Sequence, residues 1–173
     1  MQFSTLFITL SAAAGLALAA PTSQTGQSTC QRVSPSSNVV HITTRPNDVE
    51  PQILTFNVPA DARGTCTLIV DIPAGYPIQD SGVQAGHSPL PVDVIDFHSD
   101  NNGPRSGPLL YTLRIPSALP DKKTTKAVKL AISSFPCENS QGNIKLFRLQ
   151  VAAPGEVSFE LNDQSGLFVE YGC

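Results

Sequence analysis

The chain has 173 residues, a formal net charge of −3 and only 14% charged residues, together with 15 prolines and 12 glycines. Its lysines and arginines are scattered along the sequence, which argues against nucleic-acid binding, because that function needs a basic face. A low charged fraction combined with much proline and glycine is typical of a rigid extracellular β-domain and disfavours a helical enzyme.

Residues 1–19 form an apolar leader without an acidic side chain. The apolar segment is somewhat short for a membrane span, which needs about 20 residues. It ends in Ala17-Leu18-Ala19, a small-residue motif of the kind that precedes signal-peptide cleavage. We therefore predict a signal peptide at 1–19, with an uncleaved anchor as the alternative. No later stretch is apolar enough to cross a bilayer, so we expect a secreted protein, extracellular or in the cell wall, without a membrane span.

The segment that follows the leader, residues 20–37, is rich in serine, threonine and glutamine and poor in apolar side chains. Such a composition cannot bury enough apolar surface to fold by itself, so we predict a flexible lead-in. The remaining residues, 38–173, have the length of one ordinary domain with its own core. We predict a single domain there.

All four cysteines lie after the predicted cleavage site, at Cys30, Cys66, Cys137 and Cys173. In an oxidising compartment an even number of cysteines predicts disulfides, here two. Neighbouring cysteines are at least 36 positions apart, whereas zinc ligands usually come in close pairs, so no metal is expected. Three pairings remain open, because the stabilisation by a disulfide grows only logarithmically with loop length.

From Asn38 onward the sequence alternates short apolar or amphipathic runs with clusters of proline, glycine, asparagine and aspartate. Strict alternation, as in Val157, Phe159 and Leu161, is typical of a half-buried strand. Prolines stand at the edges of the runs, where strand pairing can stop. We predict an all-β, antiparallel two-sheet β-sandwich of about nine strands, with a closed β-barrel as the alternative. The nine runs are 39–44, 52–58, 66–72, 92–98, 109–115, 127–133, 144–151, 157–161 and 167–171.

Two long connections, 73–91 and 99–108, are the expected functional edges, because loops on a rigid scaffold tend to carry binding residues. Arg105 on the second loop could also serve as the bait of a protease inhibitor. Tryptophan is absent, so a sugar-binding groove would have to use a tyrosine ring. The candidate binding residues are Tyr76, His87, Asp96, His98, Asp100 and Arg105.

Catalytic chemistry has little support in the sequence. The densest polar group is DVIDFHSDN at 93–101. Its carboxylates and imidazole could hold a divalent cation or act as acid and base, but the same residue types favour a polar turn after a strand, which we prefer. There is no G-x-S-x-G motif, and cysteines in disulfides offer no thiolate. We predict no catalytic residue, metal or cofactor.

Three stretches carry a resemblance to a known family. TFNVPADARGTCTLIVDIP (55–73) has an FNVP-type strand that leads through a short turn to a cysteine and a run ending in proline. FPCENSQGNIKLFRLQV (135–151) and VSFELNDQSGLFVEYGC (157–173) place a cysteine after an apolar strand, add a Phe-Glu-Leu strand, and close on Gly-Leu-Phe and a final cysteine. Together they resemble the fungal secreted proteins with the But-two C-terminal domain, named for a yeast binder of a ubiquitin-like activating enzyme.

This resemblance covers roughly residues 50–173 and departs most between 75 and 120. It implies a fungal source, an all-β fold and secretion, and it implies no catalytic residues. The predicted signal peptide and disulfides argue against the cytosolic partner in the family name. We therefore expect a secreted, non-catalytic binding or structural protein, wall-associated or effector-like. A carbohydrate-binding module, a protease inhibitor and a hydrolase are the alternatives, and a polysaccharide or a host or cell-surface protein is the expected kind of partner.

Overall fold

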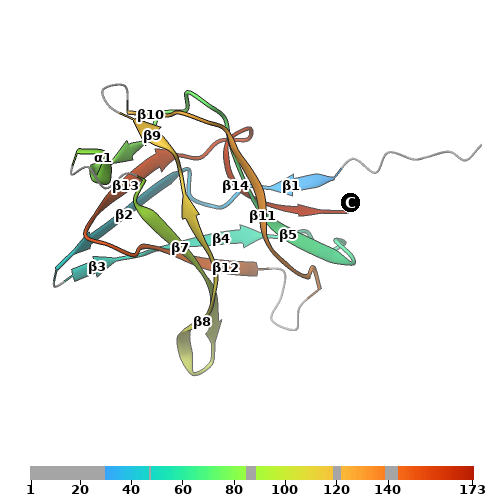
Figure 1. Cartoon of the computed structure of the whole chain (residues 1–173). Helices are drawn as coiled ribbons and strands as arrows, with labels where there is room; N and C mark the ends of the chain where they lie inside the picture. The colour runs from blue at the N-terminus through green and yellow to red at the C-terminus, as the bar shows by residue number, and fades with distance from the viewer. Residues whose placement is uncertain (1–29, 47, 85–88, 119–121, 139–143) are drawn as a thin grey trace, which may run out of the picture.

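The computed structural model of the protein describes residues 30–46, 48–84, 89–118, 122–138 and 144–173 (Figure 1). The predicted signal peptide, most of the predicted lead-in and the candidate residue His87 lie outside these ranges. The described strands are β1 (Gln31–Val33), β2 (Val39–Arg45), β3 (Asp48–Glu50), β4 (Gln52–Asn57), β5 (Thr65–Ile72), β6 (Gln79–Asp80), β7 (Pro91–Asp100), β8 (Gly103–Arg114), β9 (Ser117–Ala118), β10 (Lys123–Thr124), β11 (Val128–Pro136), β12 (Ile144–Val151), β13 (Gly155–Glu160) and β14 (Gly166–Tyr171).

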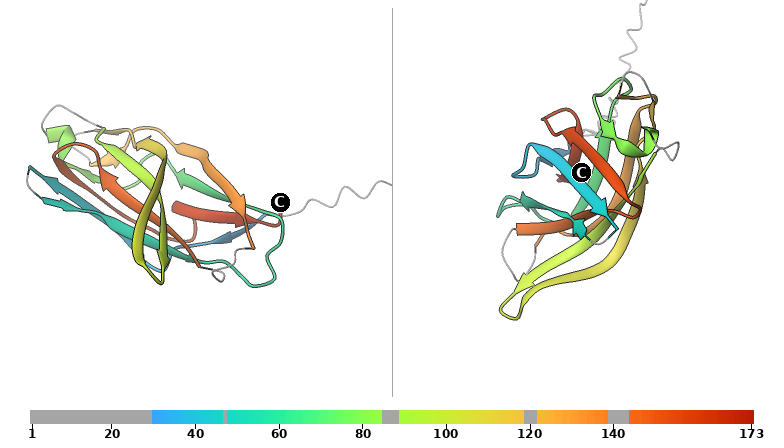
Figure 2. Two further views of the ribbon diagram at one scale, coloured as in Figure 1. Left: turned by 90° about the horizontal axis from the view of Figure 1, so that it is seen from below. Right: turned by 90° about the vertical axis from the view of Figure 1, so that its left-hand side faces the viewer.

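The all-β prediction is confirmed, and every described strand pairing is antiparallel. Three four-stranded sheets form: sheet I in the order β1-β14-β5-β11, sheet II in the order β4-β12-β7-β8, and sheet III in the order β3-β2-β13-β6. A two-stranded pair, β10-β9, stands apart from them. The strands lie in layers, as in a sandwich (Figure 2). Within the described residues each sheet is open at both ends, so the barrel alternative is not formed.

A four-residue helix, α1 (Ser81–Gln84), follows β6. The buried Asp80, the last residue of β6, stabilises the connection around α1. Its carboxylate accepts hydrogen bonds from the backbone N–H groups of Gly82 (2.8 Å) and Leu90 (3.2 Å) and from the hydroxyl of Ser117 (3.0 Å). A buried carboxylate needs such donors, and here they tie β6 to the start of β7. Within the described ranges no helix has the length and apolarity to cross a membrane.

The core is one hydrophobic cluster built from the inward faces of sheets I, II and III. In β12, Phe147 and Leu149 are fully buried while Arg148 between them points to the other face. In β13, Phe159 is buried and Ser158 and Glu160 point outward. This is the period-two alternation of a strand with one buried face, as the sequence predicted for 157–161.

The number of disulfides is also confirmed, and the structure resolves the pairing as Cys30–Cys173 and Cys66–Cys137. The first bond joins the residue before β1 to the last residue after β14, so both ends of the described domain are fastened to sheet I. Arg32 strengthens the same place, since its guanidinium bridges Glu170 (2.9 Å) and Asp71 (3.1 Å). The terminal cysteine thus holds the closing strand, as expected.

The predicted loop at 99–108 is mostly strand, which corrects the sequence prediction. β7 continues to Asp100 and β8 begins at Gly103, so only two asparagines form the turn. The positive φ of the hairpin lies at Gly103 (99°), directly after the two asparagines and not at either of them. Glycine suits that position because it tolerates left-handed backbone angles. Within the described residues β8 pairs only with β7, and an edge strand tolerates the two prolines that suggested a loop. The hairpin extends beyond the neighbouring strands (Figures 1 and 2).

Candidate functional site

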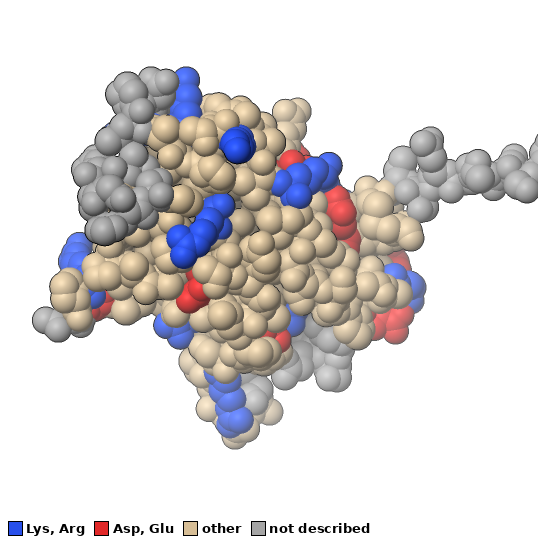
Figure 3. All heavy atoms as spheres, viewed as in Figure 1, with Lys and Arg blue, Asp and Glu red and all other residues tan. Residues whose placement is uncertain are grey.

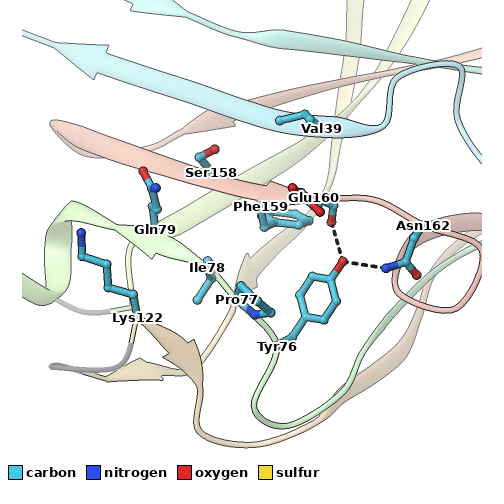
Figure 4. Close-up of a pocket in the computed structure, with 10 residues that line it drawn as sticks. All are labelled: Val39, Tyr76, Pro77, Ile78, Gln79, Lys122, Ser158, Phe159, Glu160 and Asn162. Carbon is cyan, nitrogen blue, oxygen red and sulfur yellow. Dashed lines mark hydrogen bonds between the residues drawn. The ribbon is translucent and has the colours of Figure 1, made fainter.

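A pocket of about 550 Å³ lies against the outward face of sheet III. It is bounded on one side by the end of β13 and on the other by the segment that precedes β6 (Figure 4). The residues that line it are Val39, Tyr76, Pro77, Ile78, Gln79, Lys122, Ser158, Phe159, Glu160 and Asn162. We call it the Tyr76 pocket.

The pocket opens where the segment before β6 leaves β13. β6 pairs with β13 only through Gln79 and Asp80. Upstream, the chain turns to β10 instead: the N–H of Ile78 donates to the carbonyl of Lys122 and the N–H of Tyr76 to the hydroxyl of Thr124, both at 2.8 Å. The two backbone paths therefore diverge, and the space between them is not closed by a sheet ladder. Ile78 and Phe159, both at most 5% exposed, form an apolar floor.

Tyr76 is held at the wall of this pocket by two hydrogen bonds of its phenol (Figure 4). The hydroxyl donates to the backbone carbonyl of Glu160 (3.2 Å) and accepts from the side-chain amide of Asn162 (3.0 Å). Both contacts are between residues more than 80 positions apart in the sequence. The ring is thereby fixed in orientation, with its polar end bound and its apolar part available at the pocket wall.

The rim of the pocket carries four polar side chains with no hydrogen bond or ion pair to any described residue. They are a carboxylate, an ammonium, an amide and a hydroxyl, which together offer donors and acceptors in several directions. Lys122 has a left-handed backbone with a φ of 49°, an uncommon conformation for a residue other than glycine. The four are Gln79, Lys122, Ser158 and Glu160.

The electrostatics of the pocket favour a protonated Tyr76. Burial raises the pKa of the phenol above its ordinary value of 10.0, and the negative charge of Glu160 raises it further. Both effects disfavour the phenolate. Tyr76 therefore remains a hydrogen-bond donor to the Glu160 carbonyl throughout the physiological range.

We expect this shift to be measurable by alkaline absorbance titration. The difference between wild type and Tyr76→Phe should show a phenol that ionises with a midpoint above pH 10. Because the folded pKa lies above the unfolded one, the associated stabilisation is complete below pH 10 and is lost as the pH rises through the folded pKa. Glu160→Gln should move the midpoint part of the way back, since burial is the larger cause. The outward-facing Glu156→Gln on the same strand is the control, and a midpoint at or below 10 would contradict the assignment.

Of the residues predicted from the sequence, only Tyr76 lies at this pocket. Asp96, His98 and Arg105 lie on the β7–β8 hairpin of sheet II and do not line it. His87 and the side chain of Asp100 are outside the described part of the chain. The described candidate residues therefore do not converge on one site.

Asp96 and His98 instead form a charged cluster with Lys145. The Asp96 carboxylate contacts the Lys145 ammonium at 2.7 Å and the His98 imidazole at 3.0 Å. The ammonium also lies 5.1 Å from the centre of the Phe135 ring and 5.4 Å from that of Phe147, within cation–π range. Among the described residues no hydrogen bond joins His98 to a serine, threonine or cysteine side chain. This arrangement closes one end of the aromatic core and lacks the base–nucleophile contact of a hydrolase.

Arg105, the predicted inhibitor residue, lies within the β7–β8 ladder opposite His98. A regular paired strand does not present a residue as a convex bait loop would. Among the described residues, one group of three potential metal ligands occurs, Cys30, Cys173 and Glu170. The two sulfurs are bonded to each other, so they supply no thiolate to a metal.

Sequence reasoning missed most of the pocket. Ser158 and Glu160 were placed on the outward face of their strand by the alternation, but nothing indicated what lies beside them. Gln79, Lys122 and Asn162 come from three separate connections, and their meeting depends on strand pairing that has no local signal. The indication of the pocket that the sequence does contain is Tyr76, an aromatic residue in a connection that is rich in proline and glycine.

Charge is sparse on the face shown in Figure 3, where the basic side chains are scattered and several lie beside acidic ones. Comparison of the chain with protein-family models, with curated proteins and with solved structures finds no match. The resemblance to the But-two domain family therefore stays a prediction.

Proposed function

We propose that this protein is a secreted, non-catalytic binding protein that holds a short segment of an extracellular polysaccharide in the Tyr76 pocket. In the setting that the resemblance implies, it acts at the fungal cell wall or on a host surface. The proposal keeps the leading sequence prediction, a binding protein, and joins to it the carbohydrate-binding alternative. Two disulfides and a predicted leader are consistent with this location.

The observation that carries the proposal is a fixed aromatic ring beside four uncommitted polar side chains over an apolar floor. A sugar ring has one face of C–H groups, which packs on an aromatic or aliphatic surface, and a rim of hydroxyls, each able to donate and accept. Tyr76, Ile78 and Phe159 match the face, and Gln79, Ser158 and Glu160 match the rim. Pockets of a few hundred Å³ with a few convergent polar groups are typical binding sites.

The balance of charges that line the Tyr76 pocket also suits a neutral ligand. The described lining has one carboxylate, Glu160, and one ammonium, Lys122, so the pocket has no excess of either sign. Both groups can hydrogen-bond to hydroxyls without requiring a counter-ion in the ligand. A strongly anionic or cationic ligand would be repelled by one of them.

The test is retention of the purified protein on insoluble chitin, β-glucan and cellulose. We expect retention on one of the three, and we expect Glu160→Ala to weaken it roughly tenfold, the effect of losing about 1.4 kcal/mol of binding. This substitution removes the Glu160 side chain but keeps the backbone carbonyl that accepts the hydrogen bond from Tyr76. Glu156→Ala is the matched control, because Glu156 points outward from the same strand and does not line the pocket.

Two outcomes would reject the proposal. The first is a wild-type protein that is retained on none of the three polysaccharides. The second is retention that Glu160→Ala and Tyr76→Phe leave unchanged, which would place the sugar contact elsewhere on the molecule. Retention that Glu156→Ala reduces as strongly as Glu160→Ala would also count against the pocket, since it would show a non-specific charge effect.

A further inference from the structure

The outward face of sheet II carries apolar side chains where a solvent-facing sheet would carry polar ones. Side chains alternate between faces along a strand. Since Leu54, Val94 and Phe147 point into the core, their neighbours point out. The strand register places four outward residues in one row across the whole sheet: Ile53 on β4, Arg148 on β12, Ile95 on β7 and Leu109 on β8.

The row is exposed at both of its ends, with Ile53 at 44% and Leu109 at 56% of full accessibility. Leu146 and Phe97 pair with each other in the adjacent row, and Phe97 is buried although it does not belong to the main core cluster. We call the surface made of Ile53, Ile95, Leu109, Leu146 and Arg148 the Arg148 patch. Single exposed apolar residues are ordinary, but a contiguous row marks an interaction surface.

Arg148 is the charged residue at the centre of the row, and its charge has no counter-ion among the described residues. One terminal nitrogen, Nη1, donates to the Ser106 hydroxyl at 3.0 Å. Its Nε is buried and donates to no described acceptor. The carboxylate of the neighbouring row, Asp93, accepts from Thr112 instead. By contrast, Arg32 is bound to two carboxylates and Arg63 to one.

The unsatisfied Nε and the unpaired charge of Arg148 destabilise the free protein. A buried N–H without an acceptor loses its hydrogen bond to water and receives nothing in return, and a partly desolvated charge without a partner is costly. The same features favour association. The desolvation of one guanidinium nitrogen, Nε, has already occurred in the free protein, and a carboxylate that reaches the group across an apolar surface forms a charge-assisted hydrogen bond that is partly shielded from water.

We propose that the Arg148 patch is a docking surface for a protein partner that presents a carboxylate between apolar side chains. The carboxylate would come from a glutamate or aspartate in an extended segment, and the apolar side chains would cover Ile53, Ile95 and Leu109. Arginine and apolar residues at the centre of a patch are typical of protein interfaces. The proposal is independent of the Tyr76 pocket, whose lining shares no residue with this patch.

The test uses three synthetic peptides of twelve residues, each with alternating valine and threonine and with a single central glutamate, glutamine or lysine. Binding to the full chain is followed by fluorescence anisotropy. We expect the glutamate peptide to bind roughly tenfold more tightly than the glutamine peptide and the lysine peptide to bind weakest. Arg148→Met, which keeps the length of the apolar stem, should remove the preference for glutamate. Arg63→Met is the matched control, because Arg63 lies in a connection outside sheet II.

A second readout separates a binding role from a structural one. If Arg148 serves a partner, Arg148→Met should raise the melting temperature of the free protein, because it removes an unsatisfied buried donor. A lowered melting temperature would show that the arginine supports the fold, and it would overturn the proposal. So would equal affinities for the three peptides, or sedimentation data in which the wild type self-associates and Arg148→Met does not, since the patch would then be an interface between copies of this chain.

Discussion

Loss of the Cys66–Cys137 disulfide is expected to destabilise the protein more than loss of the Cys30–Cys173 disulfide. Chain entropy alone favours the opposite ranking. The two bonds close separations of 71 and 143 residues, which corresponds to stabilisations of about 4.4 and about 5 kcal/mol. The difference between these values is small, so the environment of each bond in the native state decides the outcome.

The environments of the two disulfides differ sharply. Cys66 is fully buried and Cys137 is 3% exposed, and both belong to the hydrophobic core. Replacing them with alanine would remove two sulfur atoms from close-packed surroundings and leave a cavity. Cys30 and Cys173 are exposed at the two ends of the described domain. There, loss of the bond allows the three-residue strand β1 to fray, and this regained freedom in the native state offsets part of the cost.

We therefore expect a loss of about 5 kcal/mol for the double variant Cys66→Ala/Cys137→Ala and about 3 kcal/mol for Cys30→Ala/Cys173→Ala, measured by urea denaturation. Since domains are stable by only about 5–15 kcal/mol, the first variant should lose at least about a third of its stability and unfold at a much lower urea concentration. A larger loss for the terminal pair would mean that loop length governs both bonds and that packing around Cys66 adds nothing.

The strand prediction succeeded where the strands are long and have one buried face. All nine predicted runs coincide with described strands, and 144–151 matches β12 residue for residue. The five strands that were missed have two or three residues each. A segment of that length contains at most one alternation, so periodicity cannot reveal it. These short strands form because a neighbouring strand has unpaired backbone groups, which is a property of the assembled sheet.

Features that depend on which strands become neighbours could not be derived from the sequence. Cys30 pairs with Cys173 because β1 lies beside β14, and Cys66 with Cys137 because β5 lies beside β11. Neither adjacency has a local signature. Strand alternation puts Phe168 on the same face as Glu170, yet Phe168 is almost fully buried. Arg32, from β1, lies 5.1 Å from the centre of its ring and covers it.

The pocket and the Arg148 patch illustrate the same limit for function. In the structure Glu160 and Arg148 lie on the outward faces of their strands, but their significance comes from what surrounds them. Glu160 matters because the chain leaves β13 beside it, and Arg148 because the register puts apolar side chains on both of its flanks. Both contexts are long-range, whereas the clustered Asp96 and His98 that attracted notice in the sequence serve to close the core.

We expect Phe147→Ala to lower the free energy of unfolding by about 4 kcal/mol, since replacing a buried aromatic residue by alanine typically costs about 3–5 kcal/mol. Phe147 is fully buried at the middle of β12. Its ring meets that of Phe56 edge-on at 5.7 Å, lies 5.9 Å from Phe135 and supports the Lys145 ammonium. Side chains from three strands, β4, β11 and β12, converge there, so no single neighbour can move to fill the space.

The loss of unfolding free energy should therefore exceed the transfer free energy of the ring alone. The substitution should also weaken the charged cluster of Asp96, His98 and Lys145. Without Phe147 the Lys145 ammonium loses one of its two aromatic contacts, and the ion pair with Asp96 becomes more exposed to water, where such pairs contribute little. Ile144→Ala is the control on the same strand, because Ile144 is 52% exposed and should cost no more than about 0.5 kcal/mol. Equal losses for the two variants in urea denaturation would show that the core around Phe147 is loosely packed. In that case the aromatic cluster would not be what joins sheet II to the rest of the fold.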